Sequence, residues 1–128
     1  ENLATASEIV ERADRLNGGL CFDSWHLTRS TNEVSDILKI PDGKILATQW
    51  NDGPAEKVYE DYYTDTLGTR VPPGEGKFLL TEMLDAIRSV NCQAPIGLEV
   101  PSKDLWSAPI EQAAAASING MKRLMGLA

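Results

Sequence analysis

Apolar residues recur at the three-to-four-residue spacing of an α-helix in several parts of the chain. This pattern predicts long amphipathic helices over residues 3–16, 78–90 and 110–125, and a shorter helix over 31–40. The first helix is expected to end at Asn17-Gly18-Gly19, because glycine readily takes the left-handed conformation that closes a helix.

Polar residues near the starts of these segments are candidates for helix caps. Thr5 and Glu8 have the spacing of a capping box in the first helix. Ser30 or Thr31 precedes the short helix, and Ser107 precedes the last one. We expect these residues to mark the helix starts.

Short apolar runs lie between the predicted helices and are typical of buried strands. They span residues 20–22, 44–50 and 96–100. Strands that alternate with helices along a chain form parallel sheets, so the fold class is α/β. These strands are too few to close a (β/α)8 barrel. The chain is therefore either a small open α/β sheet or part of a barrel.

The segment 51–76 is long, aromatic and irregular. Tyr59, Tyr62 and Tyr63 are spaced so that they fit one helical turn within it. Loops of this length in a compact domain are usually functional. We therefore expect this segment to contribute to a binding or catalytic site.

The composition is that of a globular protein, and we expect one domain over residues 1–128. Apolar residues make up 42% of the chain and charged residues 24%, which opposes disorder. No apolar run approaches the roughly 20 residues that span a bilayer, and no secretory signal is visible, so we expect a cytoplasmic protein without a membrane partner. Cys21 and Cys92 are expected to be reduced thiols, one of them in the core. The net charge of −7 opposes nucleic-acid binding.

Each predicted strand ends with a side chain that can bind a metal ion: Asp23, Gln49 and Glu99. The active sites of parallel α/β folds lie at this end of the strands. Two carboxylates and an amide oxygen form a hard ligand set that suits Mg²⁺ or Mn²⁺. The alternative interpretation is that each polar residue only marks the solvent end of its strand.

Three further side chains are candidates for substrate binding. His26 is the single histidine of the chain and follows Asp23 closely, so it could act as an acid, a base or a hydrogen-bond donor. Arg70 precedes a rigid turn rich in proline and glycine, which would hold its guanidinium as a fork for a carboxylate or phosphate. Arg29 is a similar candidate. A surface or capping role is the alternative for each residue.

Four segments, taken together, resemble sugar phosphate isomerase/epimerase proteins of the xylose-isomerase-like TIM-barrel group. Residues 22–30 (FDSWHLTRS) are similar to the family stretch DTWHxxRSG, and residues 49–52 (QWND) to a later strand end. Residues 70–76 (RVPPGEG) resemble the RxxPGEG loop, and residues 96–100 (IGLEV) resemble the last strand. The order and approximate spacing of the segments agree with the family over nearly the whole chain.

This resemblance implies the carboxy-terminal half of a (β/α)8 TIM barrel, roughly strands 5 to 8. It also implies a divalent metal ion held by Asp23, Gln49 and Glu99, with His26 in contact with the substrate and Arg70 in the loop before a helix. A further ligand, a glutamate, belongs to a strand before the first helix, and we do not assign Glu1 to it.

The leading functional hypothesis is a metal-dependent sugar isomerase or epimerase that works through an enediolate. Glu99 is expected to carry the proton, and His26 to polarise a substrate oxygen. Many family members have histidine where this chain has Gln49, and the resemblance then points to 3-dehydroshikimate dehydratases, so a lyase acting on a hydroxy-keto acid is the alternative. The abasic-site endonuclease branch is opposed by the acidic charge.

A non-catalytic interaction module is the remaining hypothesis. Half a barrel would expose apolar edges, which a homo-oligomer or a complementing amino-terminal half would cover. The tryptophans distinguish these hypotheses, because at least two should line the pocket of an active barrel, whereas a scaffold would bury them. We expect Trp106 at the substrate pocket or its rim, and leave Trp25 and Trp50 open.

Overall fold

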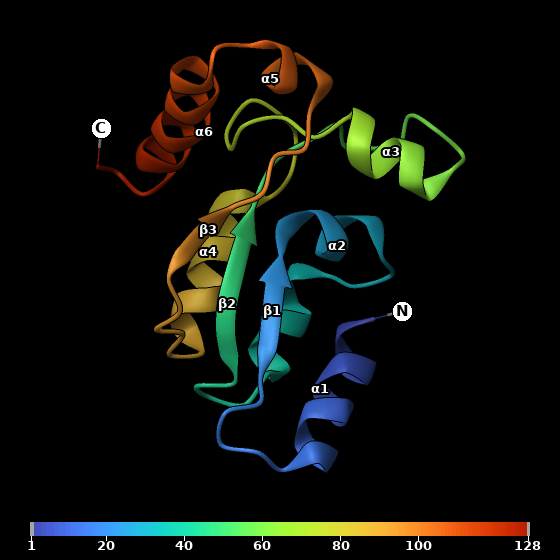
Figure 1. Cartoon of the computed structure of the whole chain (residues 1–128). Helices are drawn as coiled ribbons and strands as arrows, with labels where there is room; N and C mark the ends of the chain where they lie inside the picture. Colours follow the sequence, from blue (N-terminus) through green and yellow to red (C-terminus); the bar gives the residue numbers. More distant parts are fainter. Residues whose placement is uncertain (1, 128) are drawn as a thin grey trace.

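A computed structural model describes residues 2–127. Helices and strands alternate along the chain, and the strand ends that carry the candidate site residues lie at one end of the sheet (Figure 1). In chain order, the elements are α1 (Leu3–Ala13), β1 (Leu20–Asp23), α2 (Ser24–Arg29), the 3₁₀ helix η1 (Val34–Lys39), β2 (Ile45–Trp50), α3 (Tyr62–Gly68), α4 (Leu80–Ser89), β3 (Ile96–Leu98), α5 (Lys103–Ser107) and α6 (Ile110–Leu124).

The strands form one parallel sheet in the order β1-β2-β3 over the described residues. Asp23 is paired with Gln49, and Gln49 with Gly97, so the candidate ligand positions stand side by side across the sheet. Glu99 lies one residue beyond β3, and its backbone N–H donates to the carbonyl of Trp50. The predicted parallel α/β alternation is confirmed.

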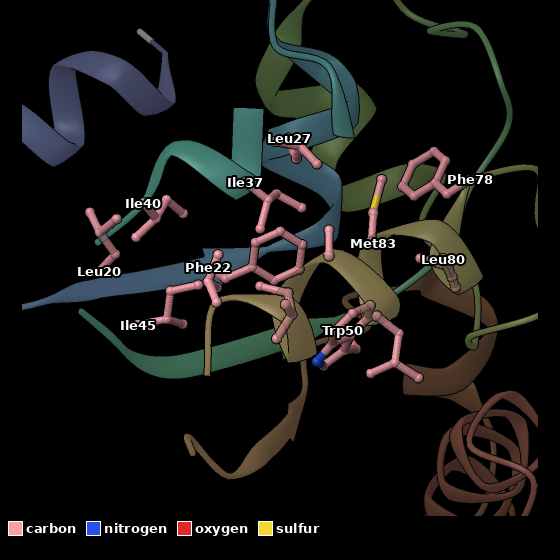
Figure 2. Packing of buried hydrophobic residues seen from close by; sticks show 14 of the residues in the cluster. Leu20, Phe22, Leu27, Ile37, Ile40, Ile45, Trp50, Phe78, Leu80 and Met83 are labelled. Carbon is pink, nitrogen blue, oxygen red and sulfur yellow. The ribbon is translucent and has the colours of Figure 1, made fainter. Parts of the chain in front are cut away.

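The hydrophobic core lies between the sheet and the helices η1 and α4. Phe22 and Trp50, from neighbouring strands, place their ring centroids 5.2 Å apart at its centre (Figure 2). Ile37 of η1 is fully buried against this cluster, and Met83 and Ile87 contribute from α4. Burial of each large apolar side chain stabilises the fold by about 1.5–3 kcal/mol. The packing therefore holds the strands firmly and fixes the direction in which they point.

Cys21 faces away from this core. It lies between the buried Leu20 and Phe22 and is exposed, because successive side chains of a strand point to opposite faces. Cys92 is partly buried, and both cysteines are free thiols. Free thiols were predicted, as was one cysteine in the core. Cys92 packs against the core but is only partly buried, so neither cysteine is a fully buried core residue.

Several helix starts differ from the predictions. Asn2, and not Thr5, caps α1 by accepting from a backbone N–H. The predicted helix over 31–40 is the 3₁₀ helix η1, with Glu33 as its cap in place of Ser30 or Thr31. Ser107 ends α5 and does not cap the last helix, which begins at Ile110 after Pro109.

The short helices α2 and α5 were not predicted, because they have too few residues to show an amphipathic period. Within the irregular segment 51–76, Tyr62 and Tyr63 lie in α3, as predicted, whereas Tyr59 precedes it. No helix in residues 2–127 is long and apolar enough to cross a membrane.

Candidate metal and substrate site

The three candidate metal ligands lie at the carboxyl ends of neighbouring strands. The amide nitrogen Nε2 of Gln49 donates to Oε1 of Glu99 at 3.2 Å. The amide oxygen Oε1 of Gln49 accepts from the thiol of Cys21 at 3.4 Å. The structure therefore brings Gln49 and Glu99 into direct contact on the face of the sheet that carries Cys21.

The two carboxylate oxygens of Asp23 have different roles: one caps a helix, and the other faces the charged residues of the site. Oδ1 caps α2 by accepting from the backbone N–H of Trp25 at 2.7 Å and of His26 at 3.3 Å, and it also accepts from the side chain of Asn51 at 3.2 Å. Oδ2 faces Arg70 and His26 instead. Because Oδ1 is already satisfied, Oδ2 is the oxygen that remains for a cation.

Arg70 joins the two carboxylates. Its Nη1 donates to Oε2 of Glu99 at 2.6 Å and to Oδ2 of Asp23 at 3.5 Å, while Nη2 donates to the hydroxyl of Thr66 at 3.1 Å. The guanidinium carbon lies 5.2 Å from the centroid of the Trp25 ring. Arg70 is buried, and its Nε has no hydrogen-bond partner among residues 2–127. One positive charge therefore lies between the two carboxylates at the strand ends and offsets part of their negative charge.

Asp52 holds the turn that carries Arg70. Its Oδ1 accepts from the backbone N–H groups of Gly53 and Phe78, and its Oδ2 accepts from that of Gly74. Val71 and Asp52 also exchange two backbone hydrogen bonds of 2.9 Å. The sequence pattern places Asp52 only in a polar strand end. The signal that could have identified it is an aspartate directly before Gly53 and Pro54, at the start of the irregular segment.

His26 points its imidazole at a residue of the long loop. Nδ1 lies 2.6 Å from the hydroxyl oxygen of Tyr62, and Nε2 lies 3.9 Å from Oδ2 of Asp23. The two rings are stacked, with centroids 6.2 Å apart. The side chain of Tyr62 is 52% exposed, and partial burial is the main reason why the pKa of its hydroxyl is raised. This phenol therefore stays protonated at neutral pH.

Arg29 anchors the long loop. Its guanidinium donates to the carboxylate of Asp65 and to three backbone carbonyls, of Pro54, Ala55 and Glu56. Its side chain is only 6% exposed. With four hydrogen bonds already made to the protein, Arg29 holds residues 54–65 in place and has little capacity to bind a substrate.

Asp65 is the buried partner of Arg29. Burial would raise its pKa, but hydrogen bonds from the backbone N–H groups of Val58 and Tyr59 and from Arg29 outweigh that effect and lower the pKa. Sequence reasoning missed Asp65, because the groups that it bonds become neighbours only when the loop folds back on itself.

The tryptophans do not form a pocket wall. Trp25 and Trp50 are fully buried, in contact with the core, and Trp106 on α5 is 62% exposed. The expectation that at least two tryptophans of an active site would line its pocket is therefore not met in residues 2–127, and the burial of Trp25 and Trp50 is what the non-catalytic hypothesis predicted. Trp25 instead packs against site residues, since the guanidinium groups of Arg29 and Arg70 lie over its ring.

An open groove of about 690 Å³ runs along the outer edge of β1. Its lining includes Asp23, His26 and Tyr62, together with Leu3 and Ala6 of α1. Gln49 and Glu99 do not line this groove, so the predicted site residues fall into two neighbouring groups that share Asp23.

The donor atoms of the site are of the type that a hard divalent cation prefers, although they are too few to form a closed site. Asp23, Gln49 and Glu99 supply oxygen donors, and the charge of Arg70 already occupies the space between the two carboxylates. No three His, Cys, Asp or Glu side chains within residues 2–127 are close enough together to hold a metal ion. The oxygen set is thus short of ligands for a closed site. Glu1 lies outside the described residues.

Comparison with known proteins agrees with this architecture. The model of the xylose isomerase-like TIM barrel family matches residues 1–124. A 3-dehydroshikimate dehydratase of Pseudomonas aeruginosa is 30% identical over 122 residues, which are 95% of this chain and 18% of that protein. An inosose isomerase of Halalkalibacterium halodurans is 29% identical over 108 residues, which are 84% of this chain and 37% of that protein.

Solved structures show the same fold. The chain superimposes with a TM-score of 0.84 and 26% identity on a xylose isomerase-like TIM barrel/4-hydroxyphenylpyruvate dioxygenase fusion protein, over 94% of this chain and 19% of that one. It also superimposes on the IolI protein with a bound zinc atom, with a TM-score of 0.84 and 23% identity, over 95% of this chain and 42% of that one. The three parallel strands therefore correspond to part of a larger TIM barrel.

Proposed function

We propose that this chain, which belongs to the xylose isomerase-like TIM barrel family, contributes part of the active site of a metal-dependent isomerase. The observation that carries the proposal is the alignment of Asp23, Gln49 and Glu99 at adjacent strand ends around Arg70. The chain spans 18% and 37% of the two curated relatives, so the proposed activity belongs to a complete barrel.

The proposed reaction moves a proton on the carbon next to a carbonyl group. A divalent cation at this site would polarise the substrate oxygens and stabilise negative charge on them. Glu99 is suited to carry the proton as well as to bind the cation, because its carboxylate is 42% exposed and lies beside Gln49. His26, with Nε2 close to Asp23, is suited to donate a hydrogen bond to a substrate oxygen.

Arg70 supplies the means to bind an anionic or strongly polar substrate. A cation held by Asp23 and Glu99 would compete with Nη1 of Arg70 for these carboxylates, and the guanidinium would then be available for a substrate carboxylate. Trp106 is proposed at the rim, where its exposed indole could cover a bound sugar. We do not extend the proposal to Arg29, since its hydrogen bonds are used within the loop.

The cation is proposed to be Mn²⁺ or Mg²⁺, because every donor is an oxygen. The related IolI protein holds zinc, so Zn²⁺ belongs in the test. Replacement of an imidazole ligand by an amide oxygen lowers the affinity expected for zinc relative to manganese.

Dehydration of a hydroxy-keto acid is the second candidate function. The specific observations that favour it are Gln49 at the position of a ligand and the 30% identity to a 3-dehydroshikimate dehydratase. The same proton removal leads to loss of a β-hydroxyl group in place of reprotonation. A sugar and a hydroxy-keto acid are therefore both proposed substrates, and Arg70 would bind the carboxylate of the second.

The test is a calorimetric titration of the chain with Mn²⁺, Mg²⁺ and Zn²⁺, with the oligomeric mass measured in parallel. Replacement of Asp23 and Glu99 by alanine should abolish binding. The matched control is the double variant Glu11→Ala, Asp42→Ala, which removes two exposed carboxylates. Equal binding by both double variants, or none by the folded wild-type chain, would contradict a metal site built from these residues.

The mass measurement addresses how the site is completed. We propose that a second copy of the chain or a complementing amino-terminal half adds the remaining strands, because β1 and β3 are both edge strands here. With metal bound, deuterium exchange next to the carbonyl of a keto-sugar indicates isomerase chemistry, and loss of water from dehydroshikimate-like acids indicates lyase chemistry.

A further inference from the structure

Tyr62 and His26 form a short contact between α3 of the segment 51–76 and α2, the helix that follows β1. The hydroxyl oxygen of Tyr62 lies 2.6 Å from Nδ1 of His26, across 36 residues of sequence. Their rings stack with an interplanar angle of 25°. Such a short contact between a phenol and an imidazole is a hydrogen bond, and its direction determines which ring nitrogen carries the proton.

The surroundings of the imidazole select one direction. If Tyr62 donates to Nδ1, the proton of neutral His26 lies on Nε2, which is 3.9 Å from the Oδ2 atom of Asp23. If Nδ1 donated to Tyr62 instead, the lone pair of Nε2 would face a carboxylate and repel it. Arg70 also lies against this carboxylate, with Nη1 3.5 Å from Oδ2. The first arrangement therefore makes the Tyr62 hydrogen bond and directs an N–H, and not a lone pair, toward the carboxylate.

Tyr62 is held firmly enough to impose this arrangement. It is the first residue of α3, whose N-terminus is capped by Asp61. Asp65, one turn further along, accepts from two backbone N–H groups of the loop and from the buried guanidinium of Arg29. The raised pKa of Tyr62, mainly due to burial, agrees with a phenol that keeps its proton and donates it.

We propose that Tyr62 is a positioning residue for His26, which it holds with the proton on Nε2 and with Nε2 directed into the groove beside Asp23. The inference rests on the proposed function in one respect, which is that His26 donates a hydrogen bond to a substrate oxygen. A tyrosine from α3 would thus fix the tautomer and the ring orientation of a hydrogen-bond donor on α2.

The experiment uses nuclear magnetic resonance on the ¹⁵N-labelled chain, in which His26 is the single histidine and gives an unambiguous signal. Long-range ¹H–¹⁵N spectra at a pH about two units above the ordinary histidine pKa of about 6.5 identify the protonated nitrogen. The wild type should show a proton on Nε2 and an accepting Nδ1. In Tyr62→Phe, the Nδ1 resonance should move to the position of a solvated imidazole.

Tyr63→Phe is the matched control, because Tyr63 is the next residue of the same helix and is 71% exposed. It should leave the His26 signals unchanged. A wild-type spectrum with the proton on Nδ1 would overturn the proposal, and so would a Tyr62→Phe spectrum that matches the wild type. The wild-type spectrum tests the proposal even if a variant does not fold. The His26 spectra can also be interpreted if the chain binds no metal, so the metal site and the role of Tyr62 are tested independently.

Discussion

Replacement of Asp65 by asparagine should destabilise the chain strongly, although Asp65 belongs to an irregular loop. The carboxylate is 2% exposed, and its Oδ2 lies 3.1 Å from Nε of Arg29, whose side chain is also buried. Asparagine keeps an oxygen for the backbone N–H groups of Val58 and Tyr59. It places an NH₂ group opposite the guanidinium, so the charge pair is lost and two donors face each other.

The magnitude follows from the burial of both partners. Removal of one partner from a buried ion pair costs about 3–5 kcal/mol, because the other charge stays buried and uncompensated. Arg29 keeps the carbonyl groups of Pro54, Ala55 and Glu56, so the lower end, about 3 kcal/mol, applies. For a domain of this size, such a loss lowers the melting temperature by about 10 °C.

The assay is urea unfolding followed by tryptophan fluorescence, since the ring of Trp25 lies 4.4 Å from the guanidinium carbon of Arg29. The control is Glu60→Gln, which removes an exposed ion pair with Lys57 in the same loop and should cost no more than about 0.5 kcal/mol. If Asp65→Asn and Glu60→Gln shift the midpoint equally, the loop is not anchored by the buried pair, and the reasoning is refuted.

Three further predictions concern the buried charges. The pKa of Asp65 is lowered in the folded chain, so the ionised carboxylate stabilises the fold above the unfolded pKa of about 4, and this stabilisation is lost as the pH falls further. The difference in unfolding free energy between wild type and Asp65→Asn, measured by urea unfolding, should therefore stay constant from about pH 7 to 5 and shrink below about pH 4. Arg70→Met should cost about 2 kcal/mol without metal, less than a fully buried pair because Glu99 is half-exposed, and Mn²⁺ should raise its melting temperature more than that of the wild type. Asp52→Asn should lose one charged hydrogen bond of the turn and about 2 kcal/mol, whereas the exposed Asp42→Asn should be neutral in the same unfolding assay.

The fold was predictable wherever a pattern repeats often enough to be read. The long helices and the strand ends at Asp23 and Trp50 follow from the apolar pattern. The end of the first helix does not, because α1 ends at Ala13, with Asp14 in the left-handed conformation, and not at the predicted Asn17-Gly18-Gly19. The helix α2 was missed because it has six residues and begins directly at a strand end. Asp23 was correctly placed at that strand end, but it was considered only as a metal ligand and its role as the cap of α2 was not predicted.

The candidate site was predictable only in part, for a different physical reason. Asp23, Gln49 and Glu99 could be placed together, because parallel strands bring their carboxyl ends to one edge. The partners of Arg29 and His26 could not, because these lie 25–36 residues away in a loop without periodicity. A sequence shows that an arginine is present, but only the folded loop shows that its donors are already used.

The two buried aspartates of the segment 51–76 should have separable effects on the site. Asp65 anchors α3, which supplies Tyr62 to His26 and also Thr66 to Nη2 of Arg70. Asp52 anchors only the turn after Arg70. Loss of the Asp65 anchor should therefore free both His26 and Arg70, whereas loss of the Asp52 anchor should change Arg70 alone.

This difference can be measured on the variants already described. In Asp65→Asn, the Nδ1 resonance of His26 should move as it does in Tyr62→Phe, and the thermal response to Mn²⁺ should change as well. In Asp52→Asn, the His26 resonance should keep its wild-type position while the response to Mn²⁺ changes. If both variants moved the His26 signal equally, the site would depend on the loop as a whole, and the separate support of His26 by α3 would be wrong.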